Sequence, residues 1–392
     1  MRILIVSQYY FPEQFQINEI APELVRRGHS VTVLTGLPNY PQGEIYEGYE
    51  KGRRDETIDG VRVIRVKEHP RKKGPLHLLL NYRSFAKNGT KKAKELEHFD
   101  IVFCYQLSPV SILKPAVSYA RKNNVPLVAY CLDIWPESAK AHTSIKPLYR
   151  MIASYSRKLY QACDHIAVTS RPFIDYLAEV NGVEKSRMSY IPQHADGTML
   201  EEDLTADDNG IVDFMYAGNM GKGQTLDVII KAAARIKDKN FVVHMVGDGS
   251  QKTVLENLVK ELGVEDKFVF HGNQKRERMP EFYKMADALL ITLRGNNAVG
   301  NTMPGKLQTY MTTGKPVFGA INGASAEVIW DSQCGKSVSS GDNKGLAELM
   351  KNYIDNPREY ADCGKNAAAY FRAHFTLEHY CDSLEQLLRS IT

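Results

Sequence analysis

The sequence predicts an α/β protein built from two doubly wound parallel-sheet domains in tandem, and three observations support this. The chain has 392 residues, which favours two domains at roughly 100–200 residues per domain. Apolar segments of strand length alternate with helical patterns along most of the chain. The alternation breaks once, in a polar and acidic stretch over residues 192–213, and then restarts. Continuous apolar strands between helices are typical of parallel sheets covered on both faces.

The first half contains the candidate strands RILIVS, HSVTVLT, VRVIRV, DIVFCY, PLVAYC, HIAVTS and MSYIPQ. Helical patterns cover residues 16–27, about 84–98, 109–123, 145–161 and 171–180. The first helix has a clear end, because Arg26 and Arg27 favour a helix C-terminus and Gly28 can adopt the positive φ of a helix stop. We interpret residues 192–213 as an interdomain linker.

The second half repeats the pattern with the strands VDFMYAG, FVVHMVG, FVFHG, ADALLITL, KPVFGA and GKSVS. Helices are predicted near 224–237, 251–262, 279–285, 304–313, 324–330 and 343–355, followed by 357–374 and 376–391. Ligands of such sheets bind beyond the carboxyl ends of the strands. Two domains of this kind would therefore form a cleft in which two substrates can meet.

Composition excludes several classes of protein. No apolar run approaches the roughly 18 residues that would suggest a membrane span. The N-terminus MRILIVSQYY resembles a first buried strand more than a signal peptide, so we expect a cytoplasmic protein. The six cysteines form no C-x-x-C pair, which argues against a zinc site and favours free thiols.

A basic segment over residues 65–94 carries ten Lys and Arg residues and a single acidic one, Glu68. It encloses the apolar run LHLLL, and cationic residues interleaved with Leu suit an anionic membrane surface. A solvated loop and helix face is the alternative. No nucleic-acid-binding motif accompanies the segment, so nucleic acid is not an expected partner. The candidate membrane or acceptor contacts are Arg71, Lys72, Lys73, Leu78 and Leu79.

Glycine- and asparagine-rich turns follow successive strands of the second half. Glycines let the backbone approach a ligand, and a helix starting near Gln224 would offer free N–H groups to an anion. The first strand of the chain lacks G-x-G-x-x-G, which disfavours a dinucleotide-binding oxidoreductase. A fourth loop, NTMPGKLQTYMTTGKP, carries one lysine, Lys306. The candidate ligand contacts in the first three turns are Gly218, Asn219, Lys222, Gly247, Asp248, Gly272 and Asn273.

In the first half, the segment YCLDIWPESAK ends a strand with two carboxylates and a tryptophan. Asp133 and Glu137 could serve acid–base chemistry or hold sugar hydroxyls, and Trp135 could stack on a sugar. The alternative is that Asp133 caps a turn and Trp135 packs in the core.

The order of these motifs resembles that of a known family. The order is SQYYFPE, RRGHSVTVLTGLPNYPQG, DIWPES, YAGNMGKGQTLDVIIKAAA, VGDGSQK, FHG, ADALLITL and MPGKLQTYMTTGKPVFGA, before a terminal helix pair. It is similar to family 4 of the retaining glycosyltransferases, whose GT-B fold has two Rossmann-like domains facing a central cleft. Within that family the likeness is to bacterial polysaccharide enzymes that transfer N-acetylated deoxyhexoses such as N-acetylfucosamine.

The resemblance implies a retaining hexosyltransferase. It would move an N-acetylated (deoxy)hexose from a UDP-sugar to a saccharide linked to polyprenyl diphosphate, in capsule or O-antigen biosynthesis. A domain over 1–200 would bind the acceptor, a domain over 210–370 the nucleotide sugar, and the last helix, about 375–392, would join the first domain. The enzyme would lie at the inner face of the cell membrane and need no metal ion or other cofactor.

The resemblance also implies roles for the fourth loop. In metal-free enzymes of this type, helix N-termini and basic side chains stabilise the departing diphosphate. Lys222 and Lys306 would supply the charge, with backbone N–H groups from Asn301, Thr302 and Met303.

This chain departs from the family pattern at several positions, among them the first loop, where Phe15 and Gln16 lie in the region of a common glycine pair. Many members carry two glutamates in the fourth loop, and Asn301 and Thr309 stand there instead. A family histidine is replaced by Leu132, which leaves Asp133 as the nearest polar candidate. Together with Glu137 and Lys306, Asp133 completes the set of candidate catalytic residues. A UDP-N-acetylhexosamine 2-epimerase and a non-catalytic nucleotide-sugar-binding protein are the alternative functions.

Overall fold

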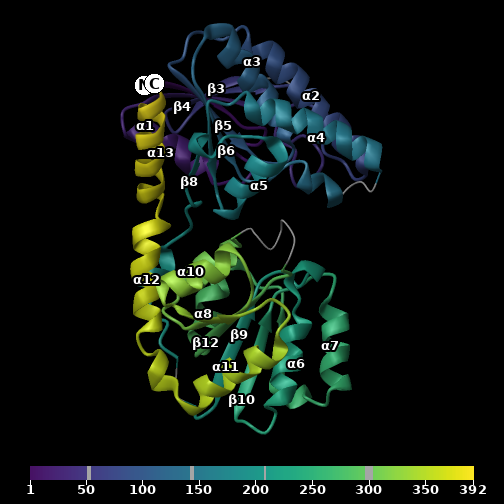
Figure 1. Cartoon of the computed structure of the whole chain (residues 1–392), viewed down its shortest axis with the longest axis vertical. Coiled ribbons are helices and arrows are strands. Elements are labelled where there is room, and N and C mark those ends of the chain that lie inside the picture. Colours follow the sequence, from purple (N-terminus) through teal and green to yellow (C-terminus); the bar gives the residue numbers. More distant parts are fainter. Residues whose placement is uncertain (51–53, 142–144, 207–208, 296–302) are drawn as a thin grey trace. The chain divides into compact units, whose positions relative to one another are not determined.

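The computed structural model describes residues 1–392 except 51–53, 142–144, 207–208 and 296–302 (Figure 1). The chain divides into two compact units. Unit 1 comprises Met1–Gln193 and Leu377–Thr392, and unit 2 comprises His194–Thr376. The boundary after Gln193 lies near the start of residues 192–213, the stretch predicted to be a linker. That stretch contains a short 3-10 helix, Thr198–Glu201.

The sheet of unit 1 has eight strands within the described residues, in the order β3-β4-β2-β1-β5-β6-β7-β8. They are β1 (Arg2–Val6), β2 (Ser30–Gly36), β3 (Asp55–Ile58), β4 (Val61–Val66), β5 (Ile101–Gln106), β6 (Leu127–Cys131), β7 (His165–Val168) and β8 (Met188–Tyr190). All neighbours are parallel except β3 and β4, which form an antiparallel edge pair. The sequence did not predict β3, because its residues DETI are polar and only half-buried, as an edge strand allows.

Helices cover both faces of this sheet. They are α1 (Ile17–Arg26), α2 (Pro75–Ala93), α3 (Leu113–Asn123), α4 (Lys146–Gln161), α5 (Pro172–Asn181) and α13 (Leu377–Ile391). Helices α1 and α13 lie on one face, and α2, α3 and α4 lie on the other (Figure 1). The predicted start of α2 near residue 84 was wrong: the helix begins at Pro75, after Gly74 with φ 104. Proline suits the first helical position, where its missing N–H leaves no bond unmade.

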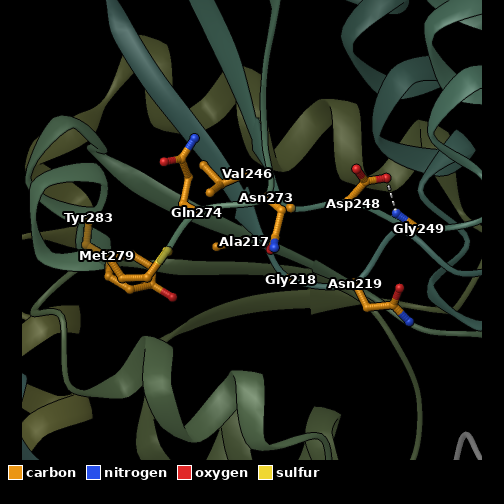
Figure 2. Close-up of a pocket in the computed structure, with 11 residues that line it drawn as sticks. Ala217, Gly218, Asn219, Val246, Asp248, Gly249, Asn273, Gln274, Met279 and Tyr283 are labelled. Atoms are coloured by element: carbon orange, nitrogen blue, oxygen red, sulfur yellow. Dashed lines mark hydrogen bonds between the residues drawn. The ribbon is translucent and has the colours of Figure 1, made fainter. Parts of the chain in front are cut away.

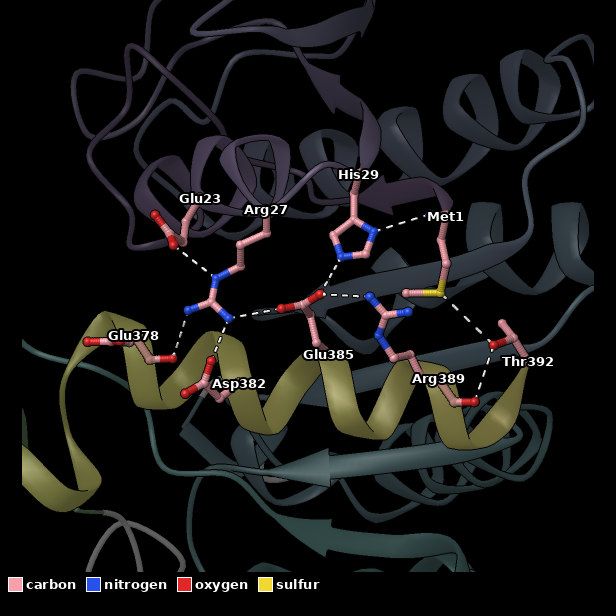
Figure 3. A network of polar contacts seen from close by, with 9 residues as sticks. All are labelled: Met1, Glu23, Arg27, His29, Glu378, Asp382, Glu385, Arg389 and Thr392. Carbon is pink, nitrogen blue, oxygen red and sulfur yellow. Dashed lines mark hydrogen bonds and ion pairs between the residues drawn. The ribbon is translucent and has the colours of Figure 1, made fainter.

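The C-terminal helix α13 belongs to the core of unit 1. Its residues Tyr380, Cys381, Leu384 and Leu388 are fully or almost fully buried in the same cluster as α1. The polar contacts between the two segments converge on Arg27 and Glu385, which are joined by a hydrogen bond of 2.9 Å (Figure 3). The helix is therefore held by both apolar burial and charge pairing.

Glu385 is the centre of this polar network. His29 lies 2.6 Å from one of its carboxylate oxygens, and Arg389 lies 3.3 Å from the same oxygen. Burial acts to raise the pKa of Glu385, but the hydrogen bonds from Arg27, His29 and Arg389 outweigh it and lower the pKa to about 2.

The sheet of unit 2 has six parallel strands among the described residues, in the order β11-β10-β9-β12-β13-β14. They are β9 (Val212–Ala217), β10 (Phe241–Val246), β11 (Phe268–Gly272), β12 (Ala288–Thr292), β13 (Val317–Ala320) and β14 (Gly335–Val338). The helices are α6 (Asp227–Arg235), α7 (Lys252–Glu261), α8 (Met279–Met285), α9 (Gly305–Met311), α10 (Ala324–Ser332), α11 (Asn343–Asp355) and α12 (Cys363–His374).

Two apolar clusters sandwich this sheet. Residues of α6, α7 and α11 pack on one face, against side chains such as Phe214 and Phe318. Residues of α8, α9, α10 and α12 pack on the other, against side chains such as Met215 and Leu289. Because alternate residues of a strand point to opposite faces, adjacent Phe214 and Met215 enter different clusters. Unit 2 is thus a doubly wound α/β domain, as the sequence predicts.

Candidate functional site

A pocket of about 690 Å³ lies at the carboxyl ends of β9, β10 and β11, entirely within unit 2. This is the edge of a doubly wound sheet at which ligands bind. Figure 2 shows Asn219, Asp248 and Gly249 on one side of the pocket and Gln274, Met279 and Tyr283 on the other. The lining residues are Ala217, Gly218, Asn219, Val246, Gly247, Asp248, Gly249, Asn273, Gln274, Met279 and Tyr283. We call this the donor pocket.

The first two turns of the donor pocket touch backbone to backbone. Gly218 and Gly247 have φ angles of 143° and 132°, which disfavour any residue with a side chain. A Cβ on Gly247 would lie 2.0 Å from the carbonyl oxygen of Gly218. Only glycine fits this contact, so the pocket edge is formed by main chain that a ligand can approach closely.

Lys306 lies beside these turns, in the first turn of α9. A Cβ on Gly218 would lie 2.7 Å from its Cε atom, so the lysine stem passes directly over that glycine. Its ammonium donates hydrogen bonds to the Tyr216 hydroxyl and to Gln224 Oε1, the latter at 3.0 Å. The Tyr216 hydroxyl in turn donates to the carbonyl of Asn219 at 2.7 Å. Lysine and turn are thereby linked through one tyrosine.

The charge of Lys306 has no acidic partner among the described residues. The ammonium lies 3.8 Å from the centre of the Tyr216 ring, and its hydrogen-bond acceptors are neutral. Burial therefore lowers the pKa of Lys306 to about 7. A bound anion would replace the missing countercharge and favour the protonated form.

The structure brings together most of the residues predicted for these turns. Gly218, Asn219, Gly247, Asp248 and Asn273 all line the donor pocket. Gly272 lies behind them, where its carbonyl accepts a hydrogen bond of 2.8 Å from the Gly247 amide.

Lys222 does not line the pocket. It is exposed in a 3-10 turn, Lys222–Gln224, and α6 begins only at Asp227. The predicted helix start near Gln224 was therefore wrong. Thr225 has a left-handed φ of 47°, which interrupts the helical path between the turn and α6.

The fourth loop is only partly described. Asn301 and Thr302 fall outside the described residues. Met303 packs against the apolar cluster of α8, α9, α10 and α12. The Thr309 hydroxyl donates to the carbonyl of Gly305 in its own helix, at 3.2 Å. That hydrogen bond uses the hydroxyl proton and leaves the oxygen lone pairs of Thr309 to accept from a ligand.

In unit 1, the two candidate carboxylates have different surroundings. Glu137 forms an ion pair with Lys140 at 2.7 Å and accepts a hydrogen bond of 3.3 Å from the Tyr176 hydroxyl. Asp133 is half-buried, and its backbone carbonyl accepts hydrogen bonds from Gln106 and Tyr160. Trp135 is buried and donates from Nε1 to the Ser108 hydroxyl at 3.1 Å, which fits its packing interpretation better than sugar stacking.

The basic segment of unit 1 is divided between a loop and a helix. Arg71, Lys72 and Lys73 precede α2, whereas Leu78 and Leu79 lie in its first two turns. All but Lys73 line a second cavity, which lies within unit 1.

Sequence reasoning missed several residues of the site. Tyr216 and Gln224 accept hydrogen bonds from Lys306. The sequence did not indicate this role, because Tyr216 was predicted as a strand residue and Gln224 as the start of a helix. Gln274, Met279 and Tyr283 line the pocket from the loop after β11 and from α8. The alternation of strand and helix could have indicated that α8 borders the strand ends, but not which of its side chains would point there.

The chain also matches known families. Residues 15–196 match Glycosyltransferase Family 4, and residues 205–370 match Glycosyl transferases group 1. The chain is a glycosyltransferase of the family 4 and group 1 type, with the GT-B fold. These matches do not show the narrower likeness to N-acetylfucosaminyltransferases that the sequence motifs suggested.

One relative of this glycosyltransferase is the putative colanic acid biosynthesis glycosyl transferase WcaI of Escherichia coli K12. It is 24% identical over 336 residues, which cover 80% of this chain and 82% of WcaI. Among solved structures, Anabaena Alr3699/HepE in complex with UDP superposes with a TM-score of 0.73 over 100% of both chains, at 16% identity. Sucrose-phosphate synthase of Thermosynechococcus elongatus gives a TM-score of 0.74 at 16% identity and covers 99% of this chain and 98% of its own. These structures establish the fold.

Neither a membrane-spanning helix nor a metal-binding cluster occurs in the described parts of the glycosyltransferase. No helix there is both long and apolar enough to cross a membrane. No three His, Cys, Asp or Glu side chains gather there in a way that could hold a metal ion. All six cysteines are free thiols, and five of them are buried.

Proposed function

We propose that this glycosyltransferase moves an N-acetylated (deoxy)hexose from a UDP-sugar to a saccharide linked to polyprenyl diphosphate, with retention at the anomeric carbon. The observation that carries the proposal is the donor pocket, where a main-chain edge of glycines lies next to a lysine that has no acidic partner in the described part of the chain. Solved neighbours of the same fold hold UDP or UDP-glucose. WcaI is named for colanic acid biosynthesis, which supports a role in surface polysaccharide biosynthesis such as capsule or O-antigen.

In this proposal the diphosphate of the donor lies over Gly218 and Gly247, beside Lys306. Because neither glycine carries a side chain, phosphate oxygens can approach the main chain closely. Lys306 is protonated on binding and balances the charge of the diphosphate. Asn219, Asp248 and Asn273 offer polar atoms at the rim for the nucleoside or the sugar.

Catalysis in this proposal depends on charge stabilisation more than on a protein nucleophile. The acceptor hydroxyl attacks the anomeric carbon from the face that the diphosphate leaves, and its proton passes to the departing phosphate oxygen. Lys306 holds that oxygen's developing charge in a partly buried site, where an ion–ion interaction is stronger than in water. Asp133 is the candidate in unit 1 to orient the acceptor hydroxyl, since Glu137 is paired with Lys140.

Unit 1 would contact both the acceptor and the membrane. Arg71, Lys72 and Lys73 stand beside Leu78 and Leu79, so positive charge and apolar surface are adjacent. Such a surface suits anionic phospholipid headgroups. We therefore propose that the enzyme associates peripherally with the inner face of the cell membrane.

The test is a transfer assay with a panel of UDP-sugars and a lipid-linked saccharide. Wild type should transfer one N-acetylated sugar, and Lys306→Ala should lose roughly 100-fold in kcat, in line with the loss of a charge-stabilising donor. Lys344→Ala is the matched control, because Lys344 is an exposed lysine of α11 outside the pocket. The proposal fails if no UDP-sugar is used or if Lys306→Ala equals wild type.

A UDP-sugar 2-epimerase is the second enzyme class with this kind of architecture. It needs no acceptor, so interconversion of UDP-sugars in the absence of a lipid-linked saccharide would replace the proposal. A binding protein without chemistry would shift its unfolding temperature with UDP but leave every UDP-sugar intact.

A further inference from the structure

Unit 1 holds a cavity of about 520 Å³ between the N-terminal turns of α2 and the first half of α4. Its lining is mainly apolar, with Leu78 and Leu79 from α2 and Leu148 and Ile152 from α4. The volume lies within the roughly 300–1,000 Å³ of small-ligand sites. We call this cavity the α2–α4 groove.

Positive charge lines the same groove. Arg71 and Lys72 border it immediately before α2 begins. The Arg71 guanidinium donates a hydrogen bond of 3.2 Å to the Tyr9 hydroxyl, and it lies 5.1 Å from the centre of the Tyr40 ring. Among the described residues no carboxylate lies within ion-pairing distance of it. A half-buried guanidinium held by tyrosines keeps its other N–H donors for an anion.

A buried polar network fixes the backbone of Arg71. Its amide donates to Asn39 Oδ1 at 2.8 Å, and the side-chain amide of Asn39 donates to the Glu68 carboxyl group. Gln8 donates from Nε2 to that carboxyl group at 3.3 Å and to Asn81 Oδ1 of α2 at 2.8 Å. The cation and the helix that carries the leucines are thereby tied to one framework, which prearranges the groove.

Large apolar side chains are exposed around the groove. Leu76 and Leu79 of α2 are 65% and 51% exposed, and Met151 of α4 is 63% exposed. Ile145, just before α4, is 61% exposed. Exposed apolar side chains on the helices that border the groove, together with the cations that line it, favour an amphiphilic partner with an anionic group.

We propose that the α2–α4 groove binds the phosphate-proximal end of a polyisoprenyl diphosphate. The diphosphate pairs with Arg71 and Lys72, and the first isoprene units lie against Leu78, Leu79, Leu148 and Ile152. In a prenyl diphosphate the charge is bonded directly to the hydrocarbon, whereas a glycerol ester separates them in a phospholipid. Arg71, Lys72, Leu78 and Leu79 line one groove, so a ligand whose charge is bonded directly to its hydrocarbon can contact the cations and the leucines together.

This inference rests on the proposed function, because the occupant would be the lipid end of the acceptor. It adds a site to that function: the lipid is bound by side chains of unit 1 and is not merely held nearby by the bilayer.

The test is a calorimetric titration of the full chain with farnesyl diphosphate, a short prenyl diphosphate that dissolves without detergent. Wild type should bind it at least tenfold more tightly than inorganic diphosphate, farnesol or dihexanoylphosphatidylglycerol. Equal affinity for inorganic diphosphate would overturn the apolar half of the proposal, and equal affinity for farnesol would overturn the ionic half. Equal affinity for dihexanoylphosphatidylglycerol would overturn the assignment of a prenyl diphosphate and indicate a phospholipid as the occupant of the groove.

Two pairs of variants locate the site. Arg71→Gln and Leu79→Asp should each weaken binding of farnesyl diphosphate at least tenfold. Arg83→Gln and Leu80→Asp are the matched controls, because both residues are exposed on α2 but do not line the groove. Controls that weaken binding as much as the groove variants would overturn the proposal. An unchanged thermal unfolding temperature verifies that each variant is folded.

The outcomes separate this inference from the proposed function. If wild type transfers sugar to the lipid-linked saccharide while Arg71→Gln and Leu79→Asp bind farnesyl diphosphate normally, only the groove assignment fails. If farnesyl diphosphate binds as described but no UDP-sugar is used, only the proposed transfer fails.

Discussion

The donor pocket of unit 2 and the α2–α4 groove of unit 1 present positive charge in two different ways. The donor pocket is bordered by main chain, and its nearby cation, Lys306, is buried enough for its pKa to fall to about 7. The groove is bordered by side chains, and its half-buried cation, Arg71, is an arginine, which stays protonated at any ordinary pH. The charge of Lys306 at the donor pocket therefore depends on pH and on the bound ligand, whereas the charge of Arg71 in the groove is constant.

The largest expected effect concerns the main-chain edge of the donor pocket. Gly247→Ala places a Cβ 2.0 Å from the Gly218 carbonyl oxygen at a φ of 132°. We expect a loss of at least about 3 kcal/mol in the free energy of unfolding, because backbone cannot move aside cheaply. Chemical denaturation measures it.

Gly263→Ala is the control for that variant. Gly263 also has a positive φ, 64°, but a Cβ there meets nothing within 4 Å. It should cost only about 1–2 kcal/mol, the penalty of the left-handed conformation alone. Equal losses at the two glycines would show that close contact between the turns is unimportant.

The next effect is the pH dependence of donor binding. Lys306 is neutral above its pKa of about 7 and must gain a proton to pair with the diphosphate. Affinity for the UDP-sugar should therefore fall by up to about tenfold for each pH unit above 7, and level off below it. Lys306→Arg should bind with little pH dependence in this range. A flat profile for wild type would contradict the pairing.

A smaller effect is expected at α13. Glu385→Gln should lower the free energy of unfolding by about 1–3 kcal/mol, because charged hydrogen bonds to Arg27 and His29 are lost. The pKa of Glu385 is lowered from 4.5 to about 2, so this stabilisation is complete above pH 4.5 and disappears as the pH falls through 2. Asp382→Asn is the control: that carboxylate is 62% exposed and should contribute less than about 1 kcal/mol.

No effect is expected from removal of metal ions. In our proposal Lys306 and the main chain balance the diphosphate charge, so excess EDTA should leave the transfer rate unchanged. A rate that falls with EDTA and returns with added Mg²⁺ would contradict this part of the proposal.

Much of the fold could be predicted from the sequence, because buried parallel strands are short apolar runs between helices. The failures have local causes. Polar β3 is an edge strand and carries no apolar run. The start of α2 was missed because its apolar first turns, next to lysines, were assigned to a membrane-binding segment.

The site was predictable where it follows one simple rule. Gly218 and Gly247 each follow a predicted parallel strand, so both could be predicted as site residues without knowledge of their neighbours. The surroundings of Lys306 and Arg71 were not predictable, because they depend on side chains distant in sequence. Tyr216 lies on β9 and Lys306 on α9, far apart in the sequence. The backbone of Arg71 is fixed through the side chain of Asn39. Such partners come together only in the folded chain.

The pairing of Lys306 with the donor diphosphate is the central claim, and proton uptake on binding tests it most directly. Calorimetric titration with UDP-N-acetylglucosamine at about pH 7, in two buffers of different ionisation enthalpy, counts the protons taken up. With a pKa of about 7 in the free protein, wild type should take up about half a proton per site, and Lys306→Met should take up none. Binding by wild type without proton uptake, or equal uptake by Lys306→Met, would contradict the account.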